Sequence, residues 1–416
     1  MDPTTHSAGG PTRPGSPADA IDEVVPAQVA TPESAEALAA LLAEAARIGQ
    51  PTVLRGGGTK IDWGRRPDRV DLLVSTAALN RVVAHRYGDL IAIVEAGARL
   101  TDVNNVLATH GQWLPIDSAF AGATIGGILA TNDSGPLRHR YGTPRDQLIG
   151  VTLATTGGRL VKAGGEVVKN VAGFDLGKLI TGSHGSLAAI TSATFKLAPQ
   201  LAASQTVRVR SVDGPQAAAS IARVCASQWE PISIDVRAES NRPSVDLLIR
   251  FSSTADAVAA QVREVVEAFG RTAAAAVDVV DGDAERALWL AQVRDVWASQ
   301  DLVVRCGWLP ASSDSVFSAL HEIEAQDGVR AILVGRAGTG AGHIRMSGEP
   351  RGQVRAIERL RAGRPRIDHV VVLRAAPAIK GQLDVWGSLG DVEIPMRALK
   401  RAFDPAGVMN AGRGPV

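Results

Sequence analysis

A glycine-rich segment at residues 121–135 constrains the fold of this chain more than any other feature. It reads Ala-Gly-Ala-Thr-Ile-Gly-Gly-Ile-Leu-Ala-Thr-Asn-Asp-Ser-Gly, with Thr124 placed to cap a helix and no side-chain bulk at Gly126 and Gly127. We expect unpaired N–H groups and the positive end of a helix dipole here, which together attract phosphate. A second glycine-rich turn at 55–60 follows the apolar run 51–54. Two loops of the phosphate-binding type on one chain suggest a dinucleotide.

Two other glycine clusters fit nucleotide motifs poorly. The stretch 173–179 is one residue too short for a P-loop and ends in Leu179, where that motif needs Ser or Thr. The stretch 338–342 has its third glycine in the wrong place for a Rossmann turn, and a strand-like run follows it. We expect a hairpin turn at 338–342.

Size and charge exclude several classes of protein. The 416 residues are enough for two or three domains, and 44 Lys plus Arg against 43 Asp plus Glu give no field that attracts nucleic acid. No apolar run approaches the roughly 18 residues of a membrane span, and residues 1–20 do not resemble a signal peptide. We expect a cytoplasmic protein without a transmembrane segment, or one held at the periphery of the inner membrane by a partner.

The two cysteines, Cys225 and Cys306, lie far apart in the sequence. They cannot supply the four thiolates that an iron–sulfur cluster usually takes, or form a Cys-x-x-Cys redox pair. Any long-range electron transfer must therefore leave this chain through another molecule.

Hydrophobic periodicity divides the chain. Thr31 and Pro32 predict a helix start, and Gly49 predicts its end. Runs at 148–155 and 159–162 predict a hairpin around Gly157 and Gly158. After residue 199, strands alternate with helices in two similar passes, which indicates an α+β domain with one antiparallel sheet. We predict a disordered tail at 1–24, a first domain at 25–199, a second domain at 200–375, and a C-terminal segment at 376–416 that returns to the first domain.

A series of motifs now points to a family. In order, these are 55–60, 123–127 with 132–135, 140–142, 145–146, Lys-Asn-Val-Ala-Gly-Phe-Asp-Leu at 169–176 and Gly-Ser-His-Gly-Ser-Leu at 182–187. The series resembles the FAD-binding domain of the vanillyl-alcohol oxidase type. Within that type it is most similar to the FAD-binding subunits of glycolate oxidase, relatives of the FAD-linked D-2-hydroxyacid dehydrogenases. The resemblance is close over 25–199 and again at 403–413, and it implies an α+β fold with a bipartite FAD-binding domain and a ferredoxin-like antiparallel cap domain.

The resemblance also assigns residues to parts of FAD. Two segments are expected to hold the pyrophosphate from either side, and other residues to line the flavin, the ribityl chain or the adenine half. The implied cofactor-binding residues are Arg55, Gly56, Gly57, Gly58, Thr59 and Lys60 with Gly122, Thr124, Ile125, Gly126 and Gly127 for the pyrophosphate; Asn132, Ser134, Gly135, Tyr141 and Gly142 for the flavin or ribityl part; Gly185 and Ile190 for the adenine half; and Asn410 over the isoalloxazine edge.

Departures from the family pattern shape the functional hypothesis. The loop 55–60 has no His or Cys for a covalent flavin link, so non-covalent FAD is expected. His184 stands where the family usually has Glu, and Ala411 where it has Pro. We interpret His139 and His184 as solvent or core histidines. In the second domain His343 stands without a second metal ligand, and no Glu-His pair occurs near 385–400. We therefore predict no metal site and assign no catalytic residue.

This pattern favours a subunit that relays electrons over one that begins the oxidation. We expect the FAD-binding subunit of a glycolate oxidase complex, working beside a catalytic FAD subunit and an iron–sulfur subunit. The complex would oxidise glycolate to glyoxylate and pass electrons to an acceptor other than oxygen. One alternative is a stand-alone FAD-dependent dehydrogenase of small 2-hydroxy acids, with Arg336, His343 or Arg345 binding the carboxylate. A second alternative is an assembly subunit without redox function.

Overall fold

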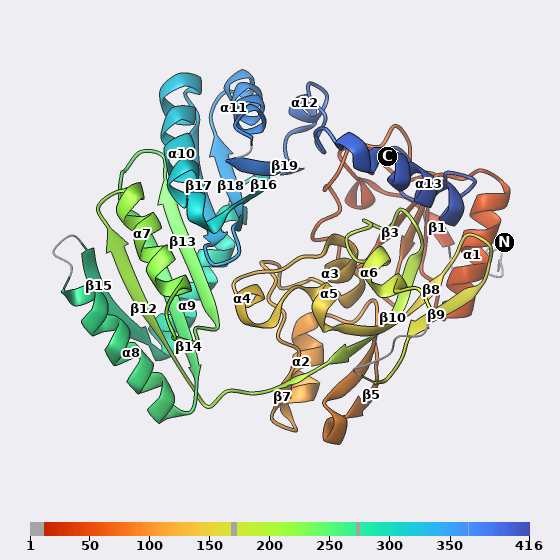
Figure 1. Cartoon of the computed structure of the whole chain (residues 1–416). Helices are drawn as coiled ribbons and strands as arrows, with labels where there is room; N and C mark the ends of the chain where they lie inside the picture. The colour runs from red at the N-terminus through yellow and green to blue at the C-terminus, as the bar shows by residue number, and fades with distance from the viewer. Residues whose placement is uncertain (1–11, 168–172, 272–274, 365) are drawn as a thin grey trace. The chain divides into compact units, whose positions relative to one another are not determined.

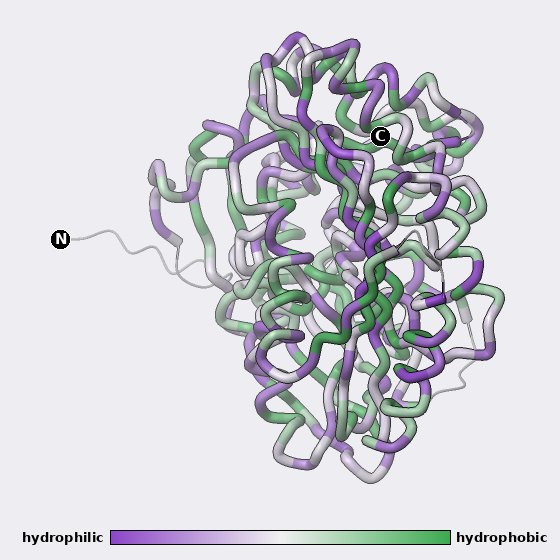
Figure 2. The backbone as a smooth tube through the Cα atoms, turned by 90° about the vertical axis from the view of Figure 1, so that its left-hand side faces the viewer, coloured by the Kyte–Doolittle hydropathy of each residue, from purple (hydrophilic) through white to green (hydrophobic). Residues whose placement is uncertain are grey.

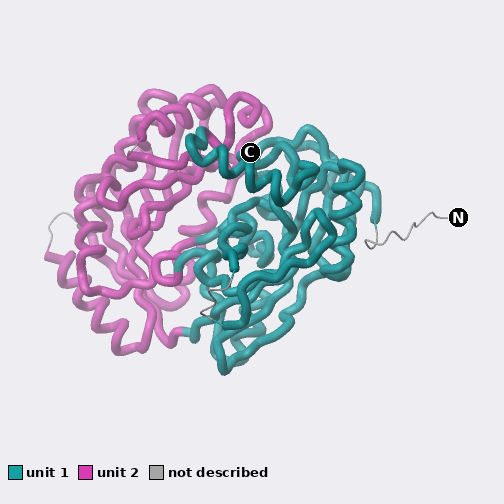
Figure 3. Tube along the Cα trace, turned by 45° about the vertical axis from the view of Figure 1, so that its right-hand side comes forward, with its two compact units in different colours: residues 1–134, 142–200, 388–416 teal, residues 135–141, 201–387 magenta. Residues whose placement is uncertain are grey.

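The computed structural model of this chain describes residues 12–167, 173–271, 275–364 and 366–416. They form two compact units (Figures 1 and 3). The first contains residues up to 134 together with 142–200 and 388–416, and the second contains 135–141 with 201–387. The short segment 135–141 therefore leaves the first unit, which the sequence did not predict. The motif residues 168–172 lie outside the described residues.

A small, mostly parallel sheet begins the first unit. Its strand order is β1 (Thr12–Pro14), β2 (Gln28–Ala30), β4 (Leu72–Ser75) and β3 (Thr52–Arg55), with β2, β4 and β3 parallel. Helix α1 (Ala35–Arg47) buries Leu38 and Leu42 against Leu72 and Val74. Its N-cap is Ser34, whose hydroxyl accepts from Ala37 N, so the predicted start at Thr31 is three residues early.

The predicted disordered tail is wrong for residues 12–24. Strand β1 pairs with β2, and the 3₁₀ helix η1 (Pro17–Asp19) follows it. Asp19 is buried and binds the guanidinium groups of Arg13 and Arg55, while the side chain of Ile21 is completely buried. The Pro- and Gly-rich composition indicated disorder because it gives no sign of these two buried anchors.

An antiparallel sheet forms the rest of the first unit. The order is β5 (Val82–Arg86), β6 (Ile91–Glu95), β10 (Ala189–Lys196), β8 (Leu148–Ala154) and β9 (Leu160–Gly164). The pairing of β8 with β9 confirms the predicted hairpin. Helices α2 (Leu100–Ala108) and α3 (Ile125–Thr131) share a core with this sheet. Short elements complete the unit: η2 (Tyr87–Asp89), β7 (Gln112–Trp113) paired with β11 (Ala198–Pro199), α5 (Pro144–Gln147), α6 (Leu176–Ile180), η5 (Gly390–Val392) and α13 (Glu393–Phe403).

One eight-stranded antiparallel sheet forms the second unit, as the alternation of strands and helices predicted. The order is β15 (Ala275–Asp281), β12 (Ala203–Ser211), β14 (Val245–Ser253), β13 (Ser233–Glu239), β17 (Arg330–Arg336), β18 (Ala341–Ser347), β16 (Leu302–Trp308) and β19 (Ile367–Arg374). The turn between β17 and β18 confirms the predicted hairpin at 338–342.

Four helices cover one face of this sheet and enclose the main core of the unit: α7 (Gly214–Cys225), α8 (Ala255–Gly270), α10 (Ser313–Asp327) and α11 (Pro350–Ala362). The remaining short elements are α4 (Arg138–Tyr141), α9 (Gly282–Arg294), η3 (Asp295–Trp297), η4 (Pro310–Ser312) and α12 (Pro377–Lys380). Hydrophobic and hydrophilic residues alternate over short distances along the chain (Figure 2), as expected where each element has one buried face.

Candidate functional site

The two glycine-rich loops of the first unit are in direct contact. A Cβ atom on Gly57 would lie 1.9 Å from the carbonyl oxygen of Gly122, and one on Gly56 would lie 2.1 Å from Thr124 Oγ1. Only glycine allows this approach, because real Cβ atoms do not come so close to backbone oxygen. The loops border an open pocket of about 550 Å³ in this unit.

Free backbone donors lie on the first loop. The N–H groups of Gly56, Gly57, Gly58 and Thr59 have no hydrogen-bond partner within the ranges that the structure describes. Four consecutive free donors at a pocket suit a pyrophosphate, whose charge is well stabilised by backbone N–H groups.

The start of α3 differs from the prediction of unpaired N–H groups. Ile125 N donates to Ala98 O at 2.9 Å, and Gly126 N donates to Ala96 O at 2.7 Å. The protein itself therefore uses these donors, because the segment packs against the turn that follows β6. Gly126 serves this packing, because a Cβ atom there would lie 2.8 Å from the Cβ atom of Ala96.

The two cations of the first loop are engaged with carboxylates. Lys60 Nζ lies 2.7 Å from Asp133 Oδ2, with both side chains more than nine-tenths buried. Asp133 also accepts from the hydroxyl of Ser118 at 2.6 Å. Arg55 Nη1 lies 3.0 Å from Asp19 Oδ1. Both cations line the pocket, yet their ion pairs fasten the loop to other parts of the unit.

A third turn adds polar atoms to an adjoining pocket of about 460 Å³. Ser183 Oγ, on this turn, is buried and has no partner in the described part of the chain. The same holds for Asn132 Oδ1, in the left-handed residue that ends α3. Buried polar atoms without partners are unfavourable, so Ser183 Oγ, which lines this pocket, is suited to a bound polar ligand. His184 lines both pockets.

The C-terminal segment supplies the last wall of the first pocket. Met409 pairs with Thr52 beside β3, and Asn410 Nδ2 donates to the carbonyl of His184 at 2.8 Å. Arg413 also lines this pocket, and sequence reasoning missed it. The segment is fastened by Asp404, which is fully buried and binds Lys400 Nζ at 2.6 Å.

The structure brings most of the predicted cofactor residues together. Ile125 lies instead in the core, and Gly135 and Tyr141 belong to the second unit. Gly142 packs on Asp146, and Gly122 supports the loop contact rather than lining a pocket. Asn132 and Ser134 do not line either pocket. The predicted residues that do are Arg55, Gly56, Gly57, Gly58, Thr59, Lys60, Thr124, Gly127 and Asn410 in the first, and Gly56, Gly126, Gly127, Gly185 and Ile190 in the second.

In the second unit, basic residues gather around His343 on the central strands. His343 pairs across the sheet with Val334 on β17 and Arg305 on β16. Arg336 Nη2 lies 3.4 Å from His343 Nδ1, and the ring of Trp297 contacts the His343 ring edgewise at a centroid distance of 5.4 Å. Within the described ranges, no three His, Cys, Asp or Glu side chains are grouped so that they could hold a metal ion.

Arg345 has a structural role that makes it a poor candidate for binding a substrate. Its Nη1 donates to the carbonyl of Asp295 at 2.8 Å, and Arg237 Nη1 binds the carboxylate of the same residue at 2.9 Å. Arg374 donates to the carbonyls of Trp297 and Asp301. Three arginines thus hold the segment 295–301.

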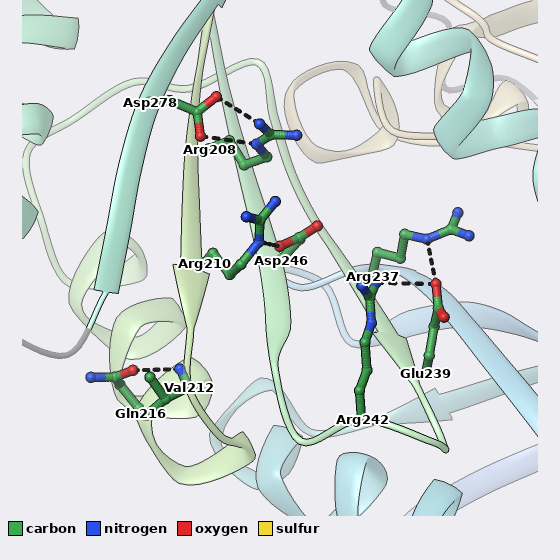
Figure 4. A network of polar contacts seen from close by, with 9 residues as sticks. All are labelled: Arg208, Arg210, Val212, Gln216, Arg237, Glu239, Arg242, Asp246 and Asp278. Atoms are coloured by element: carbon green, nitrogen blue, oxygen red, sulfur yellow. Dashed lines mark hydrogen bonds and ion pairs between the residues drawn. The ribbon is translucent and has the colours of Figure 1, made fainter.

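Ion pairs also occupy other arginines of the second unit (Figure 4). Arg208 binds Asp278 through two hydrogen bonds, and Arg210 binds Asp246 at 2.8 Å. Glu239 accepts from Arg237 and Arg242. These contacts give the arginines concerned a structural role.

Comparisons with known proteins agree with the geometry of the first unit. Residues 26–164 match the family described as FAD binding domain. An uncharacterized FAD-linked oxidoreductase of Mycobacterium tuberculosis is 27% identical over 93% of this chain and 90% of its own length. Glycolate oxidase subunit GlcE of Escherichia coli is 33% identical over 44% of this chain and 51% of that protein. D-lactate dehydrogenase of Archaeoglobus fulgidus is 33% identical over 42% of this chain and 39% of that protein.

Solved structures share the fold over nearly the whole chain. Alkyldihydroxyacetonephosphate synthase has a TM-score of 0.70 at 17% identity and covers 93% of this chain and 77% of its own. The BBE-like 1 protein of Physcomitrella patens has a TM-score of 0.69 at 15% identity and covers 98% of this chain and 97% of its own.

Fold, pocket and comparisons define an α+β flavoprotein whose FAD-binding domain is of the vanillyl-alcohol oxidase type. The chain is an FAD-dependent oxidoreductase, and the residues that match the FAD-binding family lie in the first unit apart from 135–141. None of its described helices has the length and apolar character of a membrane span.

Proposed function

We propose that this protein is the FAD-binding subunit of a glycolate oxidase complex that converts glycolate to glyoxylate with a non-oxygen electron acceptor. The row of free N–H groups at Gly56–Thr59 carries the proposal, because unpartnered backbone donors beside a pocket are suited to the FAD pyrophosphate. When bound, FAD would supply the hydride acceptor. Similarity to the glycolate oxidase subunits GlcE and GlcD supports the choice of complex.

The two cysteines of this chain are not suited to carry electrons away from the flavin, so partner proteins would have to do so. Cys306 is buried, and burial raises the pKa of its thiol to about 12, so it stays protonated and unreactive. Cys225 is exposed and far away in sequence. We therefore propose a catalytic FAD subunit and an iron–sulfur subunit as partners, non-covalent FAD in this chain, and a cytoplasmic location or attachment to the inner membrane through a partner.

The pair Arg336 and His343 favours a second candidate, a stand-alone 2-hydroxyacid dehydrogenase. A guanidinium 3.4 Å from an imidazole could bind a carboxylate beside a proton-accepting nitrogen.

An anaerobic experiment separates the two candidates. The purified, FAD-loaded chain receives glycolate or D-lactate, and the visible absorbance of the flavin is followed. We expect the flavin to stay oxidised until the partner subunits are added. Bleaching in the isolated chain that Arg336→Met abolishes, and Arg351→Met on the exposed face of α11 does not, would establish the stand-alone dehydrogenase instead.

A further inference from the structure

Arg413 binds the stretch of chain that follows the first glycine-rich loop. Its guanidinium donates to the carbonyls of Ile61 and Trp63, the latter at 2.8 Å, and more weakly to that of Arg65 at 3.4 Å. In return, Arg65 N donates to the carbonyl of Arg413 at 3.1 Å. The C-terminal segment is therefore bonded to alternate residues just beyond the loop.

The guanidinium is committed to this task. Its Nε and Nη2 atoms bind the three carbonyls, and Nη1 donates to Asn410 Oδ1 at 3.2 Å. Only 3% of the residue is exposed, and this burial lowers the pKa of the guanidinium. Arginine stays charged nevertheless, since its ordinary pKa is far above neutrality. A buried cation with so many bonds fixes the backbone that it contacts.

Two other contacts fix the loop at earlier positions. Arg55 holds its beginning through Asp19, and Lys60 holds its end through Asp133. Between these anchors lie the free N–H groups of Gly56–Thr59. A glycine-rich loop would otherwise sample many conformations, and ordering it at binding would weaken affinity.

We propose that Arg413 is a positioning residue for the pyrophosphate of FAD. It acts through the carbonyls of Ile61, Trp63 and Arg65 and holds in one conformation the loop whose unpartnered N–H groups belong to pocket-lining residues. The inference concerns the FAD-binding unit alone and does not depend on the substrate proposed above. It predicts that replacing Arg413 weakens the binding of the pyrophosphate and leaves the surroundings of the flavin unchanged.

The test compares ADP with FAD. ADP carries the same pyrophosphate without the flavin, so Arg413→Met should weaken both ligands by the same factor, at least tenfold, or about 1.4 kcal/mol. Dissociation constants are measured by titration calorimetry on the full chain freed of FAD. At saturating FAD the visible spectrum of the flavin should equal that of the natural chain, because its surroundings are intact. Arg401→Met, an exposed change on α13, is the matched control and should bind both ligands normally.

Two results would overturn the proposal. One is unchanged ADP affinity in Arg413→Met, and the other is an altered flavin spectrum at saturation, which would indicate a general structural role. If Arg413→Met does not fold, Arg413→Lys replaces it, since lysine keeps the charge but has a single nitrogen for three carbonyls. A lysine variant that binds ADP like the natural chain would equally contradict the proposal.

Discussion

At the scale of single residues, the contact between the two glycine-rich loops depends on the missing side chain of Gly57. In Gly57→Ala the new Cβ would meet the carbonyl oxygen of Gly122 at 1.9 Å, so the loops must separate. Overpacking of this kind costs about 1–3 kcal/mol, and we expect the dissociation constant of FAD to rise roughly ten- to a hundredfold. Fluorescence titration of the cofactor-free chain with FAD measures this dissociation constant.

Gly88→Ala provides the control for that substitution, because a Cβ on Gly88 has no atom within 4 Å. It should leave FAD affinity unchanged. Normal FAD binding by Gly57→Ala would show that the close approach of the loops is not required.

At the scale of elements, helix α13 carries two ion pairs of the same spacing and very different burial. Lys400 and Asp404 have 17% and 0% of their side chains exposed, and Asp404 also accepts from Val408 N and Met409 N. Removing one partner of a buried pair costs about 3–5 kcal/mol. We expect Lys400→Met to lower the free energy of unfolding by about 3 kcal/mol, as measured by urea denaturation.

The other pair on α13, Glu393 with Arg397, is exposed at 44% and 57%. Exposed pairs contribute roughly 0–1 kcal/mol, so Arg397→Met should change stability by less than about 1 kcal/mol. Equal effects of the two substitutions would contradict the view that Asp404 fastens the C-terminal segment.

At the scale of the whole molecule, each unit contains an aspartate that makes stability depend on pH. Hydrogen bonds from Arg13, Ser16 and Arg55 hold the pKa of Asp19 well below its usual range. In the second unit Arg359 and Arg355 lower the pKa of Asp327. A lowered pKa stabilises the folded chain above the unfolded pKa of about 4, and this contribution is lost as the pH falls further.

We therefore expect the urea midpoint of both units to fall as the pH is lowered from about 5 to 3. Asp19→Asn should destabilise the first unit at neutral pH. Its urea midpoint should then fall less steeply as the pH is lowered from about 5 to 3. Asp68→Asn, an exposed change in the same unit, should leave the curve unaltered. If the urea midpoint of Asp19→Asn falls with pH as steeply as that of the natural chain, groups other than Asp19 cause the pH dependence.

The sequence predicted the parts of the fold that follow from local pattern. Glycines at 56–57 and 126–127 indicated close backbone approach, and the β8–β9 and β17–β18 hairpins followed from their turn residues. Partners far away in sequence were not predictable. Nothing local shows that Lys60 binds Asp133, that Asp19 orders the N-terminal segment, or that Arg413 reaches the carbonyls of 61–65. Ser34 and Thr31 are both good N-caps, and only tertiary packing decides between them.

The assignment of segment 135–141 to the second unit has a consequence for how such proteins can diversify. The chain passes from one unit to the other after residues 134, 141, 200 and 387. Recombination that exchanges only 201–387 would replace most of the second unit but leave the original segment 135–141 in place. A functional chimera must therefore inherit 135–141 from the same parent as 201–387. The two stretches should share ancestry, although residues 142–200 of the first unit separate them in the sequence.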